Sequence, residues 1–402
     1  MKVLQLCIKP PYPPVDGGTM AMDSITQGLL REGCEVKVLT VETDKHPLRA
    51  DRLPEAYREA TGIESVYVDL GVKAVPAGVA LLCGESYNVK RYRSEAFAKR
   101  LREVLQAEAF DVVHVESIFL TPYVPLIRRY SHAKVVLRAH NVEHLIWRGM
   151  AESMSFGMKR WYIKHLALTM RAYELEHIND YDGVVCITKN DADYFRGNGC
   201  RCPVVVVPFG ITTDTPLQGP VHSDPQALSL YHIGAMDWMP NQEGVRWLLE
   251  EVWPVVRREV PQARLYLAGR KMPETLLKAE IEGVTVVGEV PDAREFIADK
   301  QINVVPLLSG SGMRVKIIEA MSMGKAVVTT TVGAQGIDYT DGENLLIADS
   351  AEQFARQIGR LVADGDYCHR VGEAAARLVA EEYNERKLSR LLIKFYQEIT
   401  ER

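Results

Sequence analysis

Short apolar runs alternate with helix-length amphipathic segments along almost the whole chain. This alternation is typical of parallel sheets whose strands are joined by crossover helices. It predicts an α/β fold, with an entirely helical tail from Ala351 onward. The predicted strands are 3–8, 35–40, 66–70, 112–116, 134–139, 183–187 and 204–207 in the first half, and 227–233, 264–268, 284–287, 303–306, 326–329 and 345–347 in the second.

The chain is long enough for two domains, because 402 residues exceed one typical hydrophobic core. A turn-rich stretch with several prolines, Thr212–Pro225, interrupts the alternation. We predict two Rossmann-like domains with parallel sheets, 1–211 and 227–383, and a linker over 212–226. A final helix follows over 384–402, and the sequence leaves open whether this helix returns to pack on the first domain. Ligands of such sheets bind at the carboxyl ends of the strands, which predicts a site in a cleft between two facing domains.

Composition excludes several classes of protein. The net charge of −5 argues against an extended nucleic-acid-binding surface. The seven cysteines are scattered, and Cys200 and Cys202 lack a second pair at zinc-site spacing, so we expect reduced thiols. The apolar run 1–8 is too short for a signal peptide, and no run reaches the ~20 apolar residues of a membrane span. We therefore predict a cytoplasmic protein without a nucleic-acid partner.

A small-residue loop in the second half indicates a binding site. The strand 302–306 runs into Leu308-Ser-Gly-Ser-Gly-Met-Arg314, which opens a helix. The glycines let a ligand approach the backbone, and the helix start offers N–H groups and a partial positive charge to an anion. Arg314 and Lys316 add two positive charges, and Glu319 can accept hydrogen bonds from sugar hydroxyls. These groups suit a nucleoside diphosphate; the alternative is an ordinary βαβ unit with solvated charges.

A loop after the first strand is a second candidate. In residues 9–19, Gly17 and Gly18 precede an amphipathic helix and can place N–H groups beside a phosphate or a sugar. The alternative is a proline-rich connector with a glycine turn.

Polar residues also gather behind the strand 134–139. His140 lies just past its end, and Asn141, Glu143 and His144 follow in the same turn. A single histidine there is more often structural, but the added polar groups favour a site. Glu116 ends the preceding strand at the same rim, and we take Glu116, Asn141 and Glu143 as candidates for the acceptor side.

These motifs resemble the retaining glycosyltransferases of family 4, which have two facing Rossmann-like domains, the GT-B fold. The segment 302–337 is similar to the family's donor-binding segment, with its Glu-x7-Glu motif followed by Ala-Met-(small)-x-Gly-Lys-Pro-Val-Val. The second glutamate is Glu319 here, whereas Ser311 stands in place of the first. The resemblance implies that Gly310, Ser311, Gly312 and Met313 contact the donor.

The resemblance extends to the other clusters. The loop 9–19 resembles the family's Pro-Pro-x-x-Gly-Gly element, which implies that Gly17 and Gly18 lie against the donor diphosphate. His140 matches a histidine that contacts the donor sugar near the reacting carbon. Arg270 falls in a Gly-Arg element that faces the donor or simply ends a turn.

Gly234 ends a strand and is a further candidate for donor binding, but the chain departs from the family directly after it. Many members carry an arginine directly after this glycine and a lysine seven residues beyond it, and both neutralise the departing diphosphate. Ala235 and Asn241 occupy these places here. We expect Arg314 and Lys316 to supply the missing charge, and Asn241 to cap a helix over 241–259.

The resemblance implies transfer of a sugar from a nucleotide-diphospho-sugar to a hydroxyl of a glycan, a lipid-linked or a small-molecule acceptor. We expect catalytic roles for His140, Arg314 and Lys316, and a ribose contact for Glu319. We recognise no metal site like that of the single-domain transferases, so we expect no metal, and no cofactor because the nucleotide-sugar is a substrate. The alternatives are a nucleotide-sugar epimerase on the same fold and a non-catalytic nucleotide-sugar-binding scaffold.

The segment 154–173 combines five basic residues with Trp161 and Tyr162 and contains no acid. Such a helix suits an anionic membrane surface, which would place the protein peripherally on the inner face of the membrane. The alternative is a half-buried helix with a solvated basic side.

Overall fold

The computed structural model describes residues 1–211, 229–310 and 312–401. The chain divides into two compact units, Met1–Gly210 with Glu385–Arg402 (unit 1), and Ile211–Asn384 (unit 2). The predicted linker, 212–226, lies outside the described residues.

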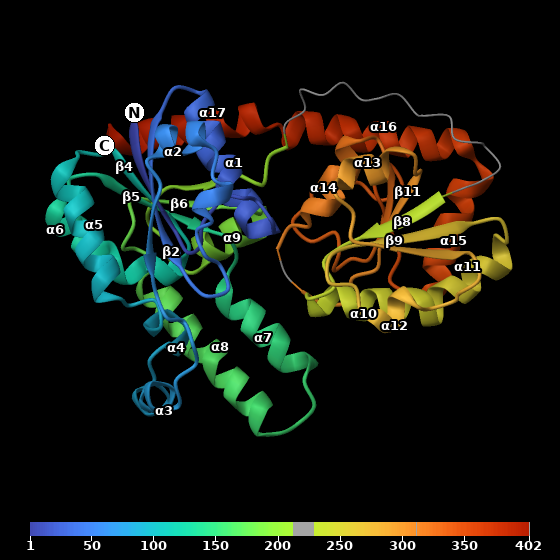
Figure 1. Ribbon diagram of the computed structural model, residues 1–402, viewed down its shortest axis with the longest axis horizontal. Coiled ribbons are helices and arrows are strands. Elements are labelled where there is room, and N and C mark those ends of the chain that lie inside the picture. Colours follow the sequence, from blue (N-terminus) through green and yellow to red (C-terminus); the bar gives the residue numbers. More distant parts are fainter. Residues whose placement is uncertain (212–228, 311, 402) are drawn as a thin grey trace. The chain divides into compact units, whose positions relative to one another are not determined.

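Unit 1 is built on a parallel sheet of seven strands in the order β3-β2-β1-β4-β5-β6-β7 (Figure 1). The strands are β1 (Lys2–Cys7), β2 (Glu35–Glu42), β3 (Glu64–Tyr67), β4 (Val112–Glu116), β5 (Lys134–Ala139), β6 (Gly183–Cys186) and β7 (Val204–Val206). The central strand β1 pairs with β2 and β4, so that Val3 lies beside Val36 and Val112. Runs of buried β-branched residues explain this sheet, because both of its faces are covered.

Helices cover both faces of the sheet in unit 1. The helices of unit 1, which include a projection away from the sheet, are α1 (Gly17–Arg31), α2 (Glu55–Thr61), α3 (Ala74–Cys83), α4 (Tyr87–Lys90), α5 (Glu95–Ala107), α6 (Val124–Tyr130), α7 (Glu143–Ser153), α8 (Met158–Glu176), α9 (Lys189–Gly197) and α17 (Glu385–Thr400). The last helix packs on α1 and the sheet through buried Leu392, Phe395 and Tyr396. Gly28 and Gly183 permit this packing, because a Cβ there would collide with Ser389 and Phe395.

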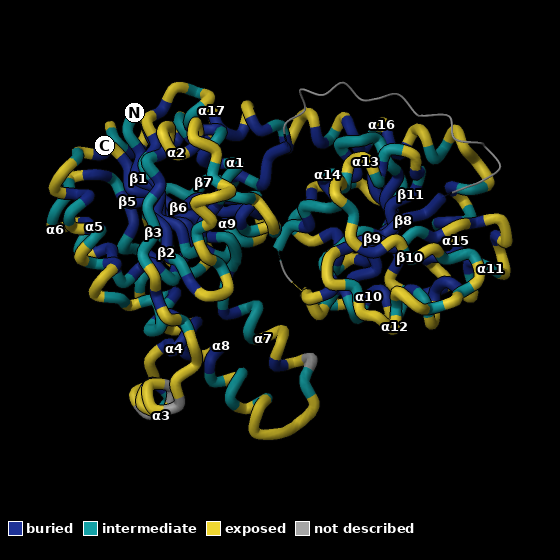
Figure 2. The backbone as a smooth tube through the Cα atoms, in the orientation of Figure 1, coloured by how far each residue is buried: buried dark blue, intermediate teal, exposed yellow. Residues whose placement is uncertain are grey.

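Unit 2 contains a parallel sheet of six strands in the order β10-β9-β8-β11-β12-β13. The strands are β8 (Ser229–Ile233), β9 (Arg264–Ala268), β10 (Val284–Gly288), β11 (Ile302–Val305), β12 (Ala326–Thr329) and β13 (Leu346–Ile347). The helices are α10 (Met239–Trp247), α11 (Trp253–Glu259), α12 (Glu274–Leu277), α13 (Ala293–Ala298), α14 (Val315–Ser322), α15 (Ala351–Ala363) and α16 (Gly365–Glu382). The strands form the buried centre of each unit (Figure 2).

The predicted α/β class with two parallel sheets is confirmed, as is the helical tail. The prediction that Asn241 caps a helix over 241–259 is wrong. The helix begins at Met239, with Pro240 in its first turn, a position that suits proline. A π-helical turn at Leu248–Val252 then separates α10 from α11.

The strand order reverses once in each sheet, between β1 and β4 and between β8 and β11. Loops after such strand pairs diverge, which leaves room for a ligand at the carboxyl ends. In unit 1 these loops begin at Ile8 and Ser117, and the first of them leads to Gly17 at the start of α1. In unit 2 they begin at Gly234 and Pro306.

Two neighbouring leucines of α17 test its packing on unit 1. Leu392→Ala should lower the free energy of unfolding by about 2–5 kcal/mol, because it leaves a cavity in a fully buried site. Leu391→Ala is the matched control, since Leu391 is 39% exposed, and should change it by about 0.5 kcal/mol or less. Urea unfolding of both variants measures the difference; equal effects would show that α17 does not pack as described.

Candidate functional site

The loop between β11 and α14 holds a cationic cluster in unit 2. Gly310 and Gly312 have φ values of +106° and +81°, which favour glycine strongly. A Cβ on Gly310 would lie 3.0 Å from the Arg314 guanidinium and 3.2 Å from the Trp238 ring. The buried Arg314 stacks over Trp238, with its Cζ 5.4 Å from the ring centroid, and donates a hydrogen bond of 3.0 Å to the Gly312 carbonyl. The two glycines thus let the loop fold around this arginine.

Lys316, in the first turn of α14, reaches the end of β8. Its Nζ donates to Asn241 Oδ1 at 2.7 Å, and Asn241 Nδ2 donates to the Ala235 carbonyl at 2.8 Å. A Cβ on Gly234 would lie 2.7 Å from the Asn241 amide and 2.9 Å from Lys316 Nζ. The ammonium of Lys316 therefore lies beside Gly234 and Asn241. This is the place where the sequence lacks the cations that the family pattern predicts.

Both cations are held in an environment that disfavours their charge. Burial lowers the pKa of Lys316 to about 7, and the nearby charge of Arg314 adds to this effect. Burial lowers the pKa of Arg314 to about 10. Among the described residues no carboxylate lies within ion-pairing distance of Lys316. An anion bound at this cluster would relieve the unfavourable burial of charge.

The other predicted donor residues of unit 2 differ in exposure. Burial raises the pKa of Glu319, on α14, and Arg294 partly opposes the increase. Arg270 is exposed, and its backbone carbonyl accepts a hydrogen bond of 2.9 Å from the Met236 amide. Met313 is half-buried at the end of the loop, and Ser311 lies outside the described residues.

The sequence did not identify two buried polar residues in the sheet of unit 2. Tyr231 and Asn303 lie on paired positions of β8 and β11, and both are fully buried. In the described residues the Tyr231 hydroxyl and the Asn303 amide have no hydrogen-bond partner. Burial, followed by the charge of Glu319, raises the pKa of Tyr231. The available signal was a polar side chain, Tyr231 or Asn303, within a strand whose other residues are mostly apolar.

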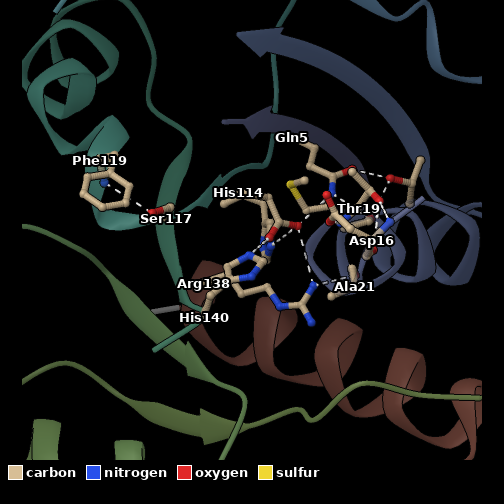
Figure 3. Close-up of polar contacts among 12 residues, drawn as sticks. Gln5, Asp16, Thr19, Ala21, His114, Ser117, Phe119, Arg138 and His140 are labelled. Atoms are coloured by element: carbon tan, nitrogen blue, oxygen red, sulfur yellow. Dashed lines mark hydrogen bonds and ion pairs between the residues drawn. The ribbon is translucent and has the colours of Figure 1, made fainter. Parts of the chain in front are cut away.

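In unit 1, four side chains from β1, β4, β5 and the residue after β5 surround the carboxylate of Glu116. Its Oε2 contacts His140 Nε2 at 2.7 Å, and its Oε1 accepts from Gln5 at 2.8 Å. His114 and Arg138 lie 3.2 Å and 3.6 Å from Oε1. Figure 3 shows Gln5, His114, Arg138 and His140 converging from neighbouring strands.

This network fixes the charge of Glu116. Burial alone would raise its pKa, but Arg138, His114 and His140 outweigh burial, and its pKa lies well below the usual value. Burial lowers the pKa of His140, with Glu116 opposing the decrease. Glu116 is therefore an anion and His140 is largely neutral at pH 7.

We expected Glu116 on the acceptor side, but its side chain is fully buried. It contacts His140 instead, whose side chain is 15% exposed. The sequence reasoning missed Gln5, His114 and Arg138, which alternate inward on β-strands like core residues. It also missed Tyr396 of α17, whose hydroxyl lies 2.5 Å from His114 Nδ1.

The loop after β1 ends in a charged helix start. Lys9 Nζ contacts both carboxylate oxygens of Asp16 at 2.7 Å, and Asp16 caps α1 together with Thr19. Gly17 and Gly18 are thus the first two residues of α1. A Cβ on Gly18 would lie 3.1 Å from Lys9 Nζ, so this glycine lets the lysine lie across the helix start.

Two carboxyl groups, those of Glu143 and Glu174, interact at the start of α7. Glu174 of α8 is buried and accepts hydrogen bonds from the backbone amides of Glu143 and His144, at 2.8 Å and 3.1 Å. It also binds the His144 ring at 2.6 Å. Burial, then the negative charge of Glu174, raises the pKa of Glu143 to about 8, while Asn141 partly opposes this. Glu143 is therefore largely protonated at neutral pH and can donate a hydrogen bond.

The part of the chain that the structure describes contains no group of three or more His, Cys, Asp or Glu side chains that could hold a metal ion.

The pH dependence of stability tests the burial of Lys316. Its pKa is about 7 in the folded state and 10.5 in the reference state, so between these values the unfolded chain binds more protons. The free energy of unfolding of the wild type, minus that of Lys316→Met, should therefore rise with pH by up to about 1.4 kcal/mol per unit and level off below pH 7.

Urea unfolding followed by tryptophan fluorescence gives this difference at each pH. Lys278→Met is the control, because Lys278 has a 76% exposed side chain and should show a flat difference. A flat difference for Lys316→Met as well would contradict its burial as a charge.

Comparisons with known proteins agree with this architecture. The sequence profile "Glycosyltransferase Family 4" matches residues 15–215, and "Glycosyl transferases group 1" matches residues 227–364. A curated relative, the "Uncharacterized 44.6 kDa protein in cps region" of Klebsiella pneumoniae, is 25% identical over 308 residues, which cover 73% of this chain and 76% of the relative.

Solved structures share the fold over nearly the whole chain. Sucrose-phosphate synthase from Thermosynechococcus elongatus has a TM-score of 0.72 at 15% identity, and covers 99% of both chains. HepE from Anabaena in complex with UDP-glucose has a TM-score of 0.65 at 13% identity, and covers 99% of this chain and 100% of its own. TarM has a TM-score of 0.71 at 11% identity, and covers 98% of this chain and 99% of its own. The two profiles, together with the two parallel sheets, show that the chain belongs to the family 4, group 1 glycosyltransferases of the GT-B fold.

Proposed function

We propose that this glycosyltransferase moves a sugar from a nucleotide-diphospho-sugar to an acceptor hydroxyl, with retention of configuration and without a metal. The observation that carries the proposal is the pair of buried cations, Arg314 and Lys316, where the strand order of unit 2 reverses. Solved structures of HepE with UDP-glucose and of TarM with UDP support a donor of this class. Retention rests on the resemblance to the retaining family.

The chemistry of the leaving group explains the need for these cations. When the glycosidic bond breaks, negative charge develops on the diphosphate, and preorganised cations in a dry site stabilise it strongly. Lys316 is close to half protonated at pH 7 without ligand. A bound diphosphate raises its pKa, so that the lysine takes up a proton and holds it while the bond breaks. Two cations and the N-terminus of α14 then replace a metal ion at the phosphates.

His140 acts at the sugar in this proposal. Because its Nε2 is bonded to Glu116, the imidazole has a fixed orientation and its Nδ1 is the nitrogen left to face a ligand. The buried anion of Glu116 favours positive charge near the ring, which suits the charge that develops at the anomeric carbon. Glu319 is assigned to the ribose, far from the bond that breaks.

Glu143 and Asn141 form the acceptor side in this proposal. The protonated carboxyl of Glu143 donates a hydrogen bond to an acceptor hydroxyl and so orients it, whether the acceptor is a glycan, a lipid-linked sugar or a small molecule.

Release of nucleoside diphosphate from a panel of nucleotide-sugars, first without and then with acceptors, tests the proposal. We expect one donor to be consumed at an unchanged rate in excess EDTA, and proton NMR to show that the product keeps the anomeric configuration. Activity that is lost in EDTA and restored by magnesium or manganese would contradict the metal-free mechanism. An inverted product would contradict retention, and no release from any donor would favour a non-catalytic scaffold.

His140 and Glu319 should affect different kinetic constants. His140→Ala should lower kcat of donor hydrolysis by about 10²-fold with a small change in donor affinity, because its contact strengthens as charge develops. Glu319→Ala should mainly raise the donor KM, because a ribose contact contributes similarly to bound substrate and transition state. Steady-state rates and calorimetric donor affinities distinguish the two. The opposite pattern in either variant would show that the assigned roles are wrong.

A further inference from the structure

The helices α7 and α8 form a hairpin that extends away from the sheet of unit 1, with α3 on the same side (Figure 1). A small hydrophobic cluster, separate from the main core, joins Ala80 of α3, Tyr87 of α4 and Leu166 of α8. The Ser86 hydroxyl also lies 3.4 Å from Met170 Sδ on α8. These helices therefore form one projection, defined here as residues 72–90 and 143–176.

The tip of this projection exposes large apolar side chains. Phe156 is 97% exposed, Met158 89% and Trp161 60%. Figure 2 shows the turn between α7 and α8 as an exposed segment. Single apolar residues on a surface need no explanation, but adjacent ones of this size indicate a binding surface.

One face of α8 combines these apolar residues with cations. Trp161, Lys164, Leu168 and Arg171 are exposed and follow the spacing of one helical face. The opposite face holds the buried Leu166 and Met170. The exposed face is therefore not needed for packing within unit 1.

The charge of the projection tip has one sign. Residues 154–173 contain Lys159, Arg160, Lys164 and Arg171 and no acidic residue, although the whole chain has a net charge of −5. On one side Glu152 lies 3.7 Å from Arg148, and on the other Glu174 is buried against His144. The exposed surface of residues 154–173 is thus basic and aromatic, and the exposed Glu152 beside it is paired with Arg148.

We propose that this projection docks the enzyme onto an anionic lipid bilayer. Phe156, Met158 and Trp161 enter the interface between headgroups and acyl chains, where aromatic side chains are favoured, and Lys159 and Lys164 contact anionic headgroups. A second copy of the chain fits this surface poorly, because an isologous contact would bring equal positive charges together. In the described part of the chain no helix is long and apolar enough to cross a membrane, so the docking is peripheral.

Co-sedimentation of the full chain with vesicles tests this proposal without donor or acceptor, so its outcome is independent of the catalytic one. The protein should bind vesicles of mixed phosphatidylglycerol and phosphatidylcholine, bind pure phosphatidylcholine far more weakly, and dissociate as salt increases. Phe156→Ser with Trp161→Ser should weaken binding about tenfold or more. Lys159→Gln with Lys164→Gln should weaken it roughly fivefold for each charge.

Matched controls remove similar groups elsewhere. Leu277→Ser removes an apolar side chain that is 47% exposed on α12, and Lys99→Gln with Arg102→Gln removes two exposed charges from α5. These variants should bind vesicles like the wild type. Circular dichroism and thermal unfolding establish that all variants fold.

Three results would overturn the proposal. The first is no binding, or equal binding to both vesicle types. The second is an equal loss in the control variants. The third is a dimer of the wild type in light scattering that Trp161→Ser abolishes, which would show that a second copy covers the surface. Quenching by brominated lipids that disappears in Trp161→Phe would instead place Trp161 within the bilayer interface.

Discussion

The burial of two positive charges at the start of α14 is the constraint on which the site depends. Lys316 and Arg314 lie where burial lowers their pKa values to about 7 and about 10. The surrounding structure holds them there through positive φ values at Gly310 and Gly312, the stacking of Trp238 and the amide of Asn241. Such an arrangement costs stability in the free protein and gains it when an anion binds, which is the pattern expected of a binding site rather than of a structural ion pair.

The buried charges of the two units have opposite signs. In unit 1 a carboxylate, Glu116, is buried and surrounded by Arg138 and two histidines, so that its negative charge is stable. In unit 2 the buried charges of Arg314 and Lys316 are positive. In the function we propose, the first arrangement orients His140 at the sugar, and the second attracts the diphosphate. The C-terminal helix contributes to the first, because Tyr396 binds His114.

The sheets could be predicted from the sequence because each strand is a compact apolar run followed by a helix, and all thirteen strands lie where predicted to within a few residues. The loop after β11 stood out because its glycines and cations are close in sequence. The partners of the site residues could not be predicted, since they are distant in sequence: 75 residues separate Lys316 from Asn241, and 282 separate Tyr396 from His114. Asparagine is a residue type that often caps helices, so the sequence suggested that role for Asn241. Only the structure shows that Asn241 instead binds Lys316, which packs against Gly234.

The pKa of Lys316, measured by NMR of its Nζ or Cε signal with and without a nucleoside diphosphate, tests the central claim most directly. Comparison with Lys316→Met assigns the signal. The account predicts a pKa near 7 in the free protein and an increase of at least about one unit on saturation with the nucleotide. An ordinary pKa near 10.5 in the free protein, or no change on binding, would contradict the role of these buried cations at the diphosphate.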